Sequence, residues 1–329
     1  MSSGNKNLML NQAKRNKSDE FFTQLSDIEN ELNHYKDYFK NKVVYCNCDE
    51  PKSSNFIKFF YDNFHTLGLR KLISTCFKAE EQSLFTNEPQ TNGIYFEYDG
   101  TNTKSIDKQK LSQLRGNGDF RSQECIEILK KADIVVTNPP FSMFREYLNQ
   151  LIDFKKNFLI IGNQNALTYK EVFTLIKHNR VWLGYGFKGH VGYFLNSHYE
   201  NTQSSSSMKD GLIRVPGVVW YTNLPNNKRN SYIKLEKKYT ENSYSKFDHY
   251  PAINVDKVSE IPLDYYELMG VPITFLHKFN PKQYKIIDAI GRYSLLKGPT
   301  PESKGKYLTN VNGKKKYTRL IIKKIGDAN

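Results

Sequence analysis

Residues 133–141 read DIVVTNPPF, and the interpretation of the whole chain starts from this stretch. Its first half is a short run of apolar, mostly β-branched residues, which is typical of a strand buried on both faces of a sheet. The run ends in Asn138, Pro139 and Pro140, followed by the aromatic Phe141. Because proline fixes φ and has no N–H, the two prolines predict a stiff, extended turn directly after a buried strand.

Strand-like and helix-like segments alternate on both sides of this stretch. Apolar runs predict further strands at 43–47, 71–77, 157–163 and 181–187, and 94–99 is interpreted as an extra strand or a hairpin arm. Helical spacing of apolar residues marks the segments 54–64, 122–132, 142–152 and 169–178, with Ser122 as a predicted helix cap. Strands that alternate with helices of about 10–15 residues indicate βαβ units. The predicted fold is therefore a doubly wound, Rossmann-like α/β domain with helices on both faces of a mostly parallel sheet.

A chain of 329 residues is too long for one small core, so a main domain and a smaller one are expected. The regular alternation spans residues 17–225, which we interpret as the main domain. The polar residues 1–16 are expected to form a mobile basic arm. Residues 226–329 are irregular, rich in aromatic and basic residues, and are interpreted as a second, basic region.

The charge balance favours a polyanionic partner. The chain has 48 Lys and Arg against 34 Asp and Glu, a net charge of +14, and residues 278–329 alone hold 13 Lys and Arg against 3 Asp and Glu. Such an excess is typical of nucleic-acid binding, although a solvated basic surface is the alternative. Since no apolar run is long enough to span a membrane and the start lacks the apolar centre of a signal peptide, we expect no membrane partner and a cytoplasmic location. The four cysteines have neither disulfide nor zinc spacing, so we expect reduced thiols and no metal.

The turn after the buried strand has the donors and acceptors of an amine-binding site. In an open α/β sheet, ligands lie beyond the carboxyl ends of the strands. There the amide oxygen of Asn138 and the carbonyl of Pro139 would accept two hydrogen bonds from one planar amino group, while Phe141 offers a stacking face. The alternative is that Asn-Pro-Pro only ends a strand.

Five segments, in order, carry a family resemblance: KSDEFFTQLSDIENEL, KVVYCNCDEP, GDFRS, ADIVVTNPPFS and GVPITFLHKFNP. They closely resemble the EcoRI-type adenine-N6 DNA methyltransferases, and they cover nearly the whole chain. The resemblance implies a class I methyltransferase sheet, S-adenosylmethionine as cofactor, and methylation of N6 on an adenine rotated out of double-stranded DNA. It further implies a monomeric, bacterial or phage-encoded enzyme of a type II restriction-modification system, a GAATTC-like site, and a cognate endonuclease without stable contact.

The resemblance also implies roles for individual residues. Asn138 and Pro139 would hold the adenine amine, Pro140 would stiffen the turn, and Phe141 would stack on the base. The implied cofactor-binding residues are Asp19, Glu20, Phe21, Thr23, Asn47, Asp49, Glu50, Cys76, Phe77, Asp119, Phe120 and Asn138. After the first strand the sequence CNCDEP lacks the GxG of most such enzymes, and a helix-capping role remains the alternative for Asp49.

Recognition of DNA is assigned to the carboxyl half of the chain. Lysines would neutralise phosphates, whereas Arg and Asn would read base edges in the major groove. The candidate DNA-binding residues are Arg214, Asn226, Asn227, Arg229, Asn230, Lys314, Lys315 and Lys316. Two other functions stay open: methylation of a protein glutamine or of RNA, which also present planar amines, and a DNA-binding protein that keeps the fold without turnover.

Overall fold

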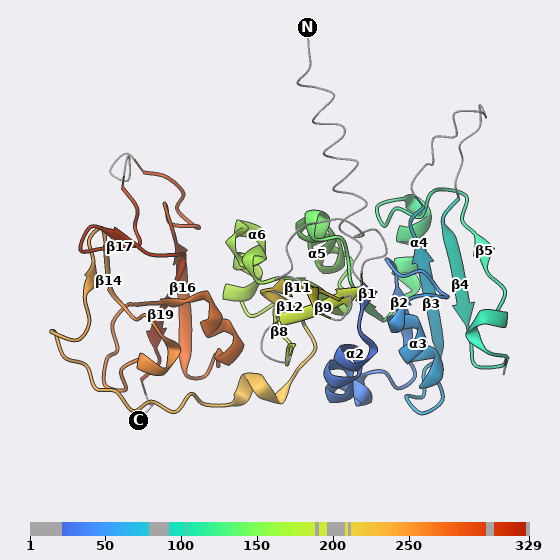
Figure 1. The fold of residues 1–329 in the computed structure, drawn as a ribbon, viewed down its shortest axis with the longest axis horizontal. Coiled ribbons are helices and arrows are strands. Elements are labelled where there is room, and N and C mark those ends of the chain that lie inside the picture. The colour runs from blue at the N-terminus through green and yellow to red at the C-terminus, as the bar shows by residue number, and fades with distance from the viewer. Residues whose placement is uncertain are drawn as a thin grey trace, which may run out of the picture. The chain divides into compact units, whose positions relative to one another are not determined.

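The computed structural model describes residues 22–78, 92–102, 104–187, 191–195, 208–209, 212–300 and 306–326 (Figure 1). The predicted arm at 1–16 lies outside these ranges. The chain divides into two compact units, one drawn from the chain up to Asn163 together with Gly186–Leu224, the other from Gln164–Tyr185 and Pro225–Asn329. The segment Gln164–Tyr185, which the sequence-based division includes in 17–225, thus clusters with the carboxyl-terminal residues. The division of function at residue 225 remains a prediction.

The first unit is built on a sheet with a parallel centre. The parallel strands are ordered β3-β2-β6-β7, and every residue of β2 and β6 is buried, as their uninterrupted apolar sequences predict. Antiparallel strands extend the sheet at both sides, and the extra strand predicted at 94–99 is one of them. The bounds are β2 (Val43–Cys46), β3 (Lys71–Cys76), β4 (Ile94–Tyr98), β5 (Ser112–Gln113), β6 (Ile134–Thr137), β7 (Asn157–Asn163) and β12 (Val218–Thr222).

Helices cover both faces of this sheet. Trp220 and Tyr221 are neighbours on β12, so their side chains point to opposite faces. Trp220 packs against Phe56 of α3 (Asn55–Asp62) with ring centroids 5.9 Å apart, whereas Tyr221 packs against Phe144 of α5 (Phe144–Asp153) at 4.8 Å. Helices on the two faces confirm the predicted doubly wound, Rossmann-like α/β class.

Serine side chains begin two of these helices. Ser122 accepts a hydrogen bond from the backbone N–H of Cys125 (3.2 Å) and caps α4 (Gln123–Lys131), as predicted. Ser54 caps α3 in the same way, accepting from the N–H of Phe56 at 3.1 Å. The other helical elements of this unit are α2 (Leu25–Leu32), η1 (Asn33–Tyr38), η2 (Ile106–Lys108) and η3 (Phe141–Met143).

A small antiparallel sheet completes the first unit. Its strand order is β1-β9-β11-β10, and it joins the residues before the first helix to the residues before β12. The bounds are β1 (Phe22–Thr23), β9 (Val191–Leu195), β10 (Met208–Lys209) and β11 (Leu212–Pro216).

The second unit has its own mixed sheet, ordered β13-β14-β15-β19-β16, with α6 (Lys170–Lys177) packed on β16. The strands of this sheet are β13 (Lys246–Phe247), β14 (Tyr250–Asn254), β15 (Met269–Pro272), β16 (Tyr284–Ile290) and β19 (Arg319–Lys324). The unit also contains β8 (Trp182–Leu183), which lies outside this sheet, and β17 (Asn310–Val311) and β18 (Lys314–Lys315), which form a two-stranded sheet of their own. Its 3-10 helices are η4 (Gln164–Thr168), η6 (Asn227–Asn230), η7 (Val258–Glu260) and η8 (Ile273–Lys278).

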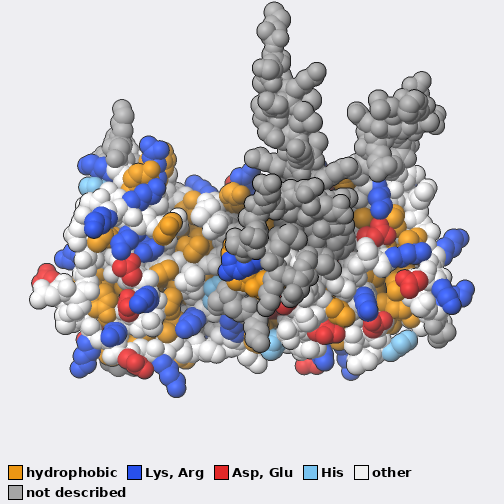
Figure 2. Space-filling view, in the orientation of Figure 1, with side chains coloured by type: hydrophobic (Ala, Val, Ile, Leu, Met, Phe, Trp, Pro, Cys, Tyr) orange, Lys and Arg blue, Asp and Glu red, His pale blue; other side chains and the backbone are white. Residues whose placement is uncertain are grey.

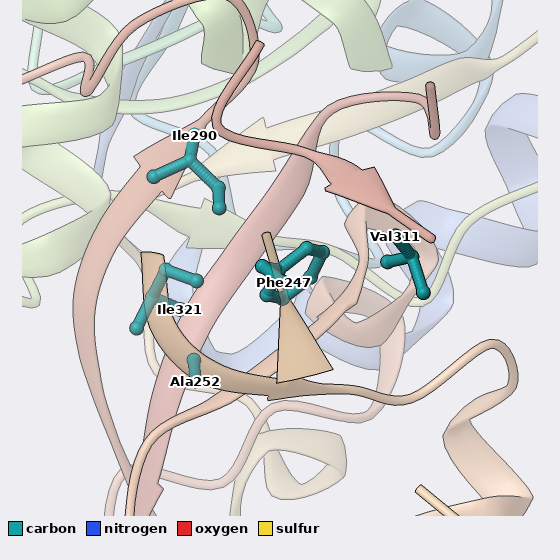
Figure 3. Close-up of a cluster of buried hydrophobic side chains, with 5 residues drawn as sticks. All are labelled: Phe247, Ala252, Ile290, Val311 and Ile321. Carbon is teal, nitrogen blue, oxygen red and sulfur yellow. The ribbon is translucent and has the colours of Figure 1, made fainter. Parts of the chain in front are cut away.

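The second unit has a basic surface and an apolar core. Figure 2 shows Lys and Arg side chains gathered with apolar ones over the part of this unit where β14 and β17 lie. In the core, Val311 of β17 packs in a cluster with Phe247, Ala252, Ile290 and Ile321 (Figure 3).

The prediction of one long strand at 181–187 is wrong. Only Trp182–Leu183 form β8, because the next carbonyls are taken by a side chain: Lys228 Nζ donates to the carbonyls of Gly184 (2.8 Å) and Tyr185 (2.9 Å). Gly186 then turns the chain with a φ of 96°. Among the helices of the described residues, none has the length and apolar character needed to cross a membrane.

Candidate active site

A cavity lies at the carboxyl ends of β2 and β6. Strand β2 contacts β3 on one side and β6 on the other, so the chain order reverses between β2 and β6. Such a switch point leaves a crevice beyond the strand ends, since the connecting segments diverge to opposite faces. The cavity occupies this crevice and has an empty volume of about 1250 Å³, including its open mouth. It is lined by Thr23, Asn47, Cys48, Asp49, Glu50, Ser54, Asn55, Phe56, Cys76, Phe77, Gly118, Asp119, Phe120, Arg121, Asn138, Pro140, Ser142 and Met143.

Asp49 connects three elements around the cavity through hydrogen bonds. One carboxylate oxygen accepts from Ser54 Oγ at 2.6 Å and the other from Thr137 Oγ1 at 2.5 Å, while its backbone carbonyl accepts from Ser74 Oγ at 2.5 Å. Burial raises the pKa of this carboxyl to about 6, against the two hydrogen bonds, which lower it. Asp49 therefore links the cap of α3, the end of β6 and strand β3.

Asn138 follows Thr137 directly and lines the cavity. Its Nδ2 lies 3.5 Å from Thr23 Oγ1, to which it donates. Thr23 is itself fixed, because Asn55 Nδ2 donates to its carbonyl at 2.8 Å. The amide of Asn138 is thus positioned from two sides, by the Asp49–Thr137 bond behind it and by Thr23 beside it.

The loop 118–121 forms another wall. Gly118 has a φ of 83°, and a Cβ there would lie 2.5 Å from the carbonyl oxygen of Cys76, so only glycine lets this loop approach the end of β3. Asp119 pairs with Arg121 at 2.6 Å, and hydrogen bonds from Arg121 lower the pKa of the Asp119 carboxyl. Phe120 is buried against the ring of Tyr147, with centroids 5.0 Å apart.

The ends of β2 and β3 complete the site. The Glu50 carboxylate pairs with Lys78 at 3.0 Å, and Phe77 is 43% exposed although it is aromatic. Asn47 is buried and accepts a hydrogen bond from the hydroxyl of Tyr147, which orients its amide within the core. The cavity therefore combines carboxylates, amides and an exposed aromatic face.

The cavity brings together most of the residues that the sequence analysis assigned to it. Thr23, Asn47, Asp49, Glu50, Cys76, Phe77, Asp119, Phe120, Asn138 and Pro140 all line it. Pro139 is buried and Phe141 is half-buried at the start of η3, and neither is among its lining residues. Asp19, Glu20 and Phe21 lie outside the described residues. The individual roles assigned to all these side chains remain predictions.

Several lining residues were not singled out from the sequence. Ser54 and Asn55 enter through the first turn of α3, and Ser142 and Met143 through η3, which follows the proline turn. A usable signal existed for Ser54, since a serine before an apolar helical segment is a typical cap. Its bond to Asp49 had no such signal, because it depends on how α3 packs against the sheet.

The candidate DNA-binding residues fall into two groups. Arg214, Asn227, Asn230, Lys314 and Lys315 are exposed. The others make contacts within the second unit: Asn226 caps η6 and donates to the carbonyl of Leu183 (3.3 Å), Arg229 lies 4.3 Å above the ring of Trp182, and Lys316 pairs with Asp256 at 3.1 Å. Contact with DNA remains a prediction for both groups.

A Rossmann-like sheet with an Asn-Pro-Pro turn beside a large cavity fits the class of methyltransferases that act on an amino group. Residues 9–325 match the family described as adenine-specific methyltransferase EcoRI. The chain belongs to this family of adenine-specific methyltransferases, and both the resemblance and the enzyme class given by the sequence are confirmed.

Three relatives match over nearly their whole length. The chain is 48% identical to the type II methyltransferase M.EcoRI of Escherichia coli, with 96% of each chain covered. It is 40% identical to M.MgeORF184P of Mycoplasma genitalium (95% of this chain, 98% of the relative) and 39% identical to M.MpnI of Mycoplasma pneumoniae (95% and 97%). Both are also named type II methyltransferases. No solved structure matches the chain.

Proposed function

We propose that the protein is a site-specific DNA methyltransferase, which transfers a methyl group from S-adenosylmethionine to N6 of an adenine rotated out of duplex DNA. The observation that supports this most directly is that one cavity holds the Asn138 turn together with the ends of β2 and β3 and the loop 118–121. A methyl donor and an adenine amino group bound there would lie next to each other in the same cavity. The relatives' names and the family's adenine specificity support the choice of base and substrate.

The side chains that line the cavity fit the chemistry of S-adenosylmethionine. Glu50 and Asp119 offer carboxylates for hydroxyl and amino groups, and the exposed ring of Phe77 offers a face for a purine. When bound, the cofactor supplies an electrophilic methyl group carried by a sulfonium.

The chain's own residues would orient the amine. The Asn138 amide oxygen and the Pro139 carbonyl accept the two hydrogens of the adenine amino group. Accepting both would hold the nitrogen lone pair out of conjugation with the ring and direct it toward the cofactor site. Thr23 and Thr137 act as positioning residues for Asn138, and Phe141 would stack on the rotated base.

The relatives' names extend the proposal to the biological setting. We propose a modification enzyme of a type II restriction-modification system that acts as a monomer in the cytoplasm of a bacterium, beside an endonuclease that it does not bind stably. On the basis of the resemblance to the EcoRI-type enzymes, we propose a GAATTC-like DNA recognition sequence. Exposed Arg214, Asn227 and Asn230 remain candidates for reading it.

Labelling with a tritiated methyl donor tests the proposed function. The protein is incubated with duplex DNA that contains GAATTC, with the same duplex carrying one changed base pair, with RNA of the same sequence, and with a mixture of proteins. We expect label only in the GAATTC duplex, as N6-methyladenine. Label in RNA or protein would show that duplex DNA is not the substrate. DNA binding without any label would show that the protein binds DNA but does not catalyse methyl transfer.

A further inference from the structure

The buried Tyr147 of α5 contacts two walls of the cavity. Its hydroxyl donates a hydrogen bond to the side-chain oxygen of Asn47, which directly follows β2. Its ring packs edge-on against Phe120 of the loop 118–121, with centroids 5.0 Å apart and planes at 73°. Asn47 and Phe120 both line the cavity, and Tyr147 is not among its lining residues. Tyr147 therefore supports two walls from behind.

Helix α5 connects Tyr147 to the proline turn. The helix begins at Phe144, directly after η3, and the N–H of Met143 donates to the carbonyl of Pro140 at 3.0 Å. Phe144 packs closely on the sheet, since a Cβ at Gly162 of β7 would lie 2.4 Å from its ring. Tyr147 lies about one helical turn further along. The turn and the two cavity walls are thus joined through the start of one helix.

The hydrogen bond from Tyr147 determines which end of the Asn47 amide is left for a ligand. Burial raises the pKa of the Tyr147 hydroxyl well above its ordinary value, so the hydroxyl keeps its proton and acts as the donor. An amide has an oxygen that accepts and a nitrogen that donates, and Tyr147 occupies the oxygen. Within the described part of the chain, no acceptor pairs with the Asn47 nitrogen. This nitrogen is therefore the group that Asn47 offers to a ligand in the cavity.

A second buried tyrosine shows what is particular about Tyr147. Tyr221 on β12 donates to the backbone carbonyl of Asn163 at 3.0 Å, and strand pairing with Val218 already fixes that residue. Tyr147 instead donates to a side-chain amide, whose last torsion has broad minima. Loss of the Tyr221 hydroxyl would leave its partner in place. Loss of the Tyr147 hydroxyl would free the Asn47 amide to rotate.

We propose that Tyr147 is a positioning residue for the cofactor: its hydroxyl holds the Asn47 amide so that the nitrogen donates a hydrogen bond to an acceptor atom of S-adenosylmethionine. A donor that is already oriented before the ligand arrives needs no further ordering on binding, which favours affinity. The inference rests on the proposed function in taking S-adenosylmethionine as the ligand.

Titration calorimetry with S-adenosylmethionine tests the proposal without turnover. Tyr147→Phe keeps the ring that packs on Phe120 and removes only the hydroxyl, so we expect it to weaken cofactor binding about tenfold. Tyr221→Phe, which removes a buried hydroxyl away from the cavity lining, is the matched control and should bind within about twofold of the wild-type protein.

A double-mutant cycle tests whether the hydroxyl acts through Asn47. Asn47→Ala should weaken cofactor binding by at least about tenfold, because it removes the donor itself. Adding Tyr147→Phe to Asn47→Ala should then change the affinity by less than about twofold, since the amide that the hydroxyl positions is absent. Losses that multiply in the double variant would overturn the proposed path through Asn47.

Kinetics separate positioning of the cofactor from general damage to the site. In Tyr147→Phe the KM for the cofactor should rise about tenfold, whereas the single-turnover rate at saturating cofactor should fall less than about threefold, because Asn138 is unchanged. A single cooperative urea transition in each variant shows that the measured protein is folded. If Asn47→Ala does not fold, the comparison of Tyr147→Phe with Tyr221→Phe still decides the proposal.

The outcomes separate this inference from the function as a whole. Wild-type affinity in Tyr147→Phe, or an equal loss in Tyr221→Phe, would overturn the positioning role while cofactor binding by the wild-type protein stands. Absence of S-adenosylmethionine binding by the wild-type protein would overturn the proposed function itself.

Discussion

Asp49 shows how one buried carboxylate organises the site. Its carboxylate accepts hydrogen bonds from Ser54 and Thr137, and its backbone carbonyl accepts one from Ser74, so it joins three elements next to the Asn138 turn. Burial raises its pKa to about 6, because desolvation outweighs the two hydrogen bonds. Asp49 does not cap a helix itself, as the alternative for this residue had it. Ser54 caps α3, and Asp49 accepts a hydrogen bond from the Ser54 hydroxyl.

The raised pKa of Asp49 gives a pH dependence whose sign is determined. The folded pKa of about 6 exceeds the ordinary value of 3.8, so in this interval the folded protein binds more protons and its stability falls as pH rises. Between pH 5 and 8 the wild-type protein should lose about 1.4 kcal/mol of unfolding free energy relative to Asp49→Asn, which cannot ionise. Urea unfolding of both proteins at several pH values measures this difference, and parallel curves would contradict it.

Asn138 is predicted to matter for the rate of methyl transfer rather than for DNA binding. Removing one positioned acceptor costs about 100-fold or more in related electrostatic sites, so Asn138→Ala should lose over about 100-fold in single-turnover rate while its DNA affinity survives. Thr23→Val, which removes the 3.5 Å hydrogen bond but keeps the amide, is the matched control and should lose under about tenfold. Near-normal turnover of Asn138→Ala would contradict the assigned role.

At the scale of elements, Gly118 and Gly313 both have left-handed φ angles, but only Gly118 also lies close to another element. Comparing their alanine variants therefore distinguishes the cost of backbone strain from the cost of a steric clash. A Cβ at Gly313 meets no atom within 4 Å, so Gly313→Ala should cost only the strain of φ 74°, about 1 kcal/mol. A Cβ at Gly118 would meet the Cys76 carbonyl at 2.5 Å, so Gly118→Ala adds a clash between two cavity walls. We expect it to cost over about 2 kcal/mol and to weaken cofactor binding at least tenfold.

Urea unfolding and cofactor titration of the two glycine variants measure these effects. Gly313→Ala should bind the cofactor as the wild-type protein does, because Gly313 lies between β17 and β18 of the second unit whereas the cavity is built from the first. Equal losses of unfolding free energy in the two variants would contradict the predicted clash between a side chain at position 118 and the carbonyl of Cys76.

For the whole molecule, the net charge of +14 predicts a strong dependence of DNA binding on salt. Displaced counterions drive such binding, so raising salt from 50 to 200 mM should weaken DNA affinity by at least about 100-fold. The cavity proposed for the cofactor has largely paired charges, as in Asp119–Arg121 and Glu50–Lys78, so cofactor affinity should change less than about threefold. Isothermal titration calorimetry at the two salt concentrations measures the affinities for DNA and for the cofactor. An equal salt dependence of the two affinities would contradict the prediction.

The sequence by itself determined the features that depend on neighbouring residues. Apolar runs gave the parallel strands β2, β3, β6 and β7, because a strand buried on both faces needs apolar residues throughout. Ser122 predicted the start of α4, and the proline turn predicted the carboxyl end of β6, which Asn138 follows. The order of the five family segments gave the class of enzyme.

Only the tertiary structure decided which polar groups meet. The bonds of Asp49 to Thr137 and of Asp256 to Lys316 join residues that lie far apart in the chain, and no local pattern encodes them. The same holds for Asn226 and Arg229, which contact Leu183 and Trp182 within the protein, although from the sequence alone they are indistinguishable from exposed DNA-reading residues. The physical reason is that burial and hydrogen-bond partners are set by the packing of whole elements, whereas strand and turn propensities are set by adjacent residues.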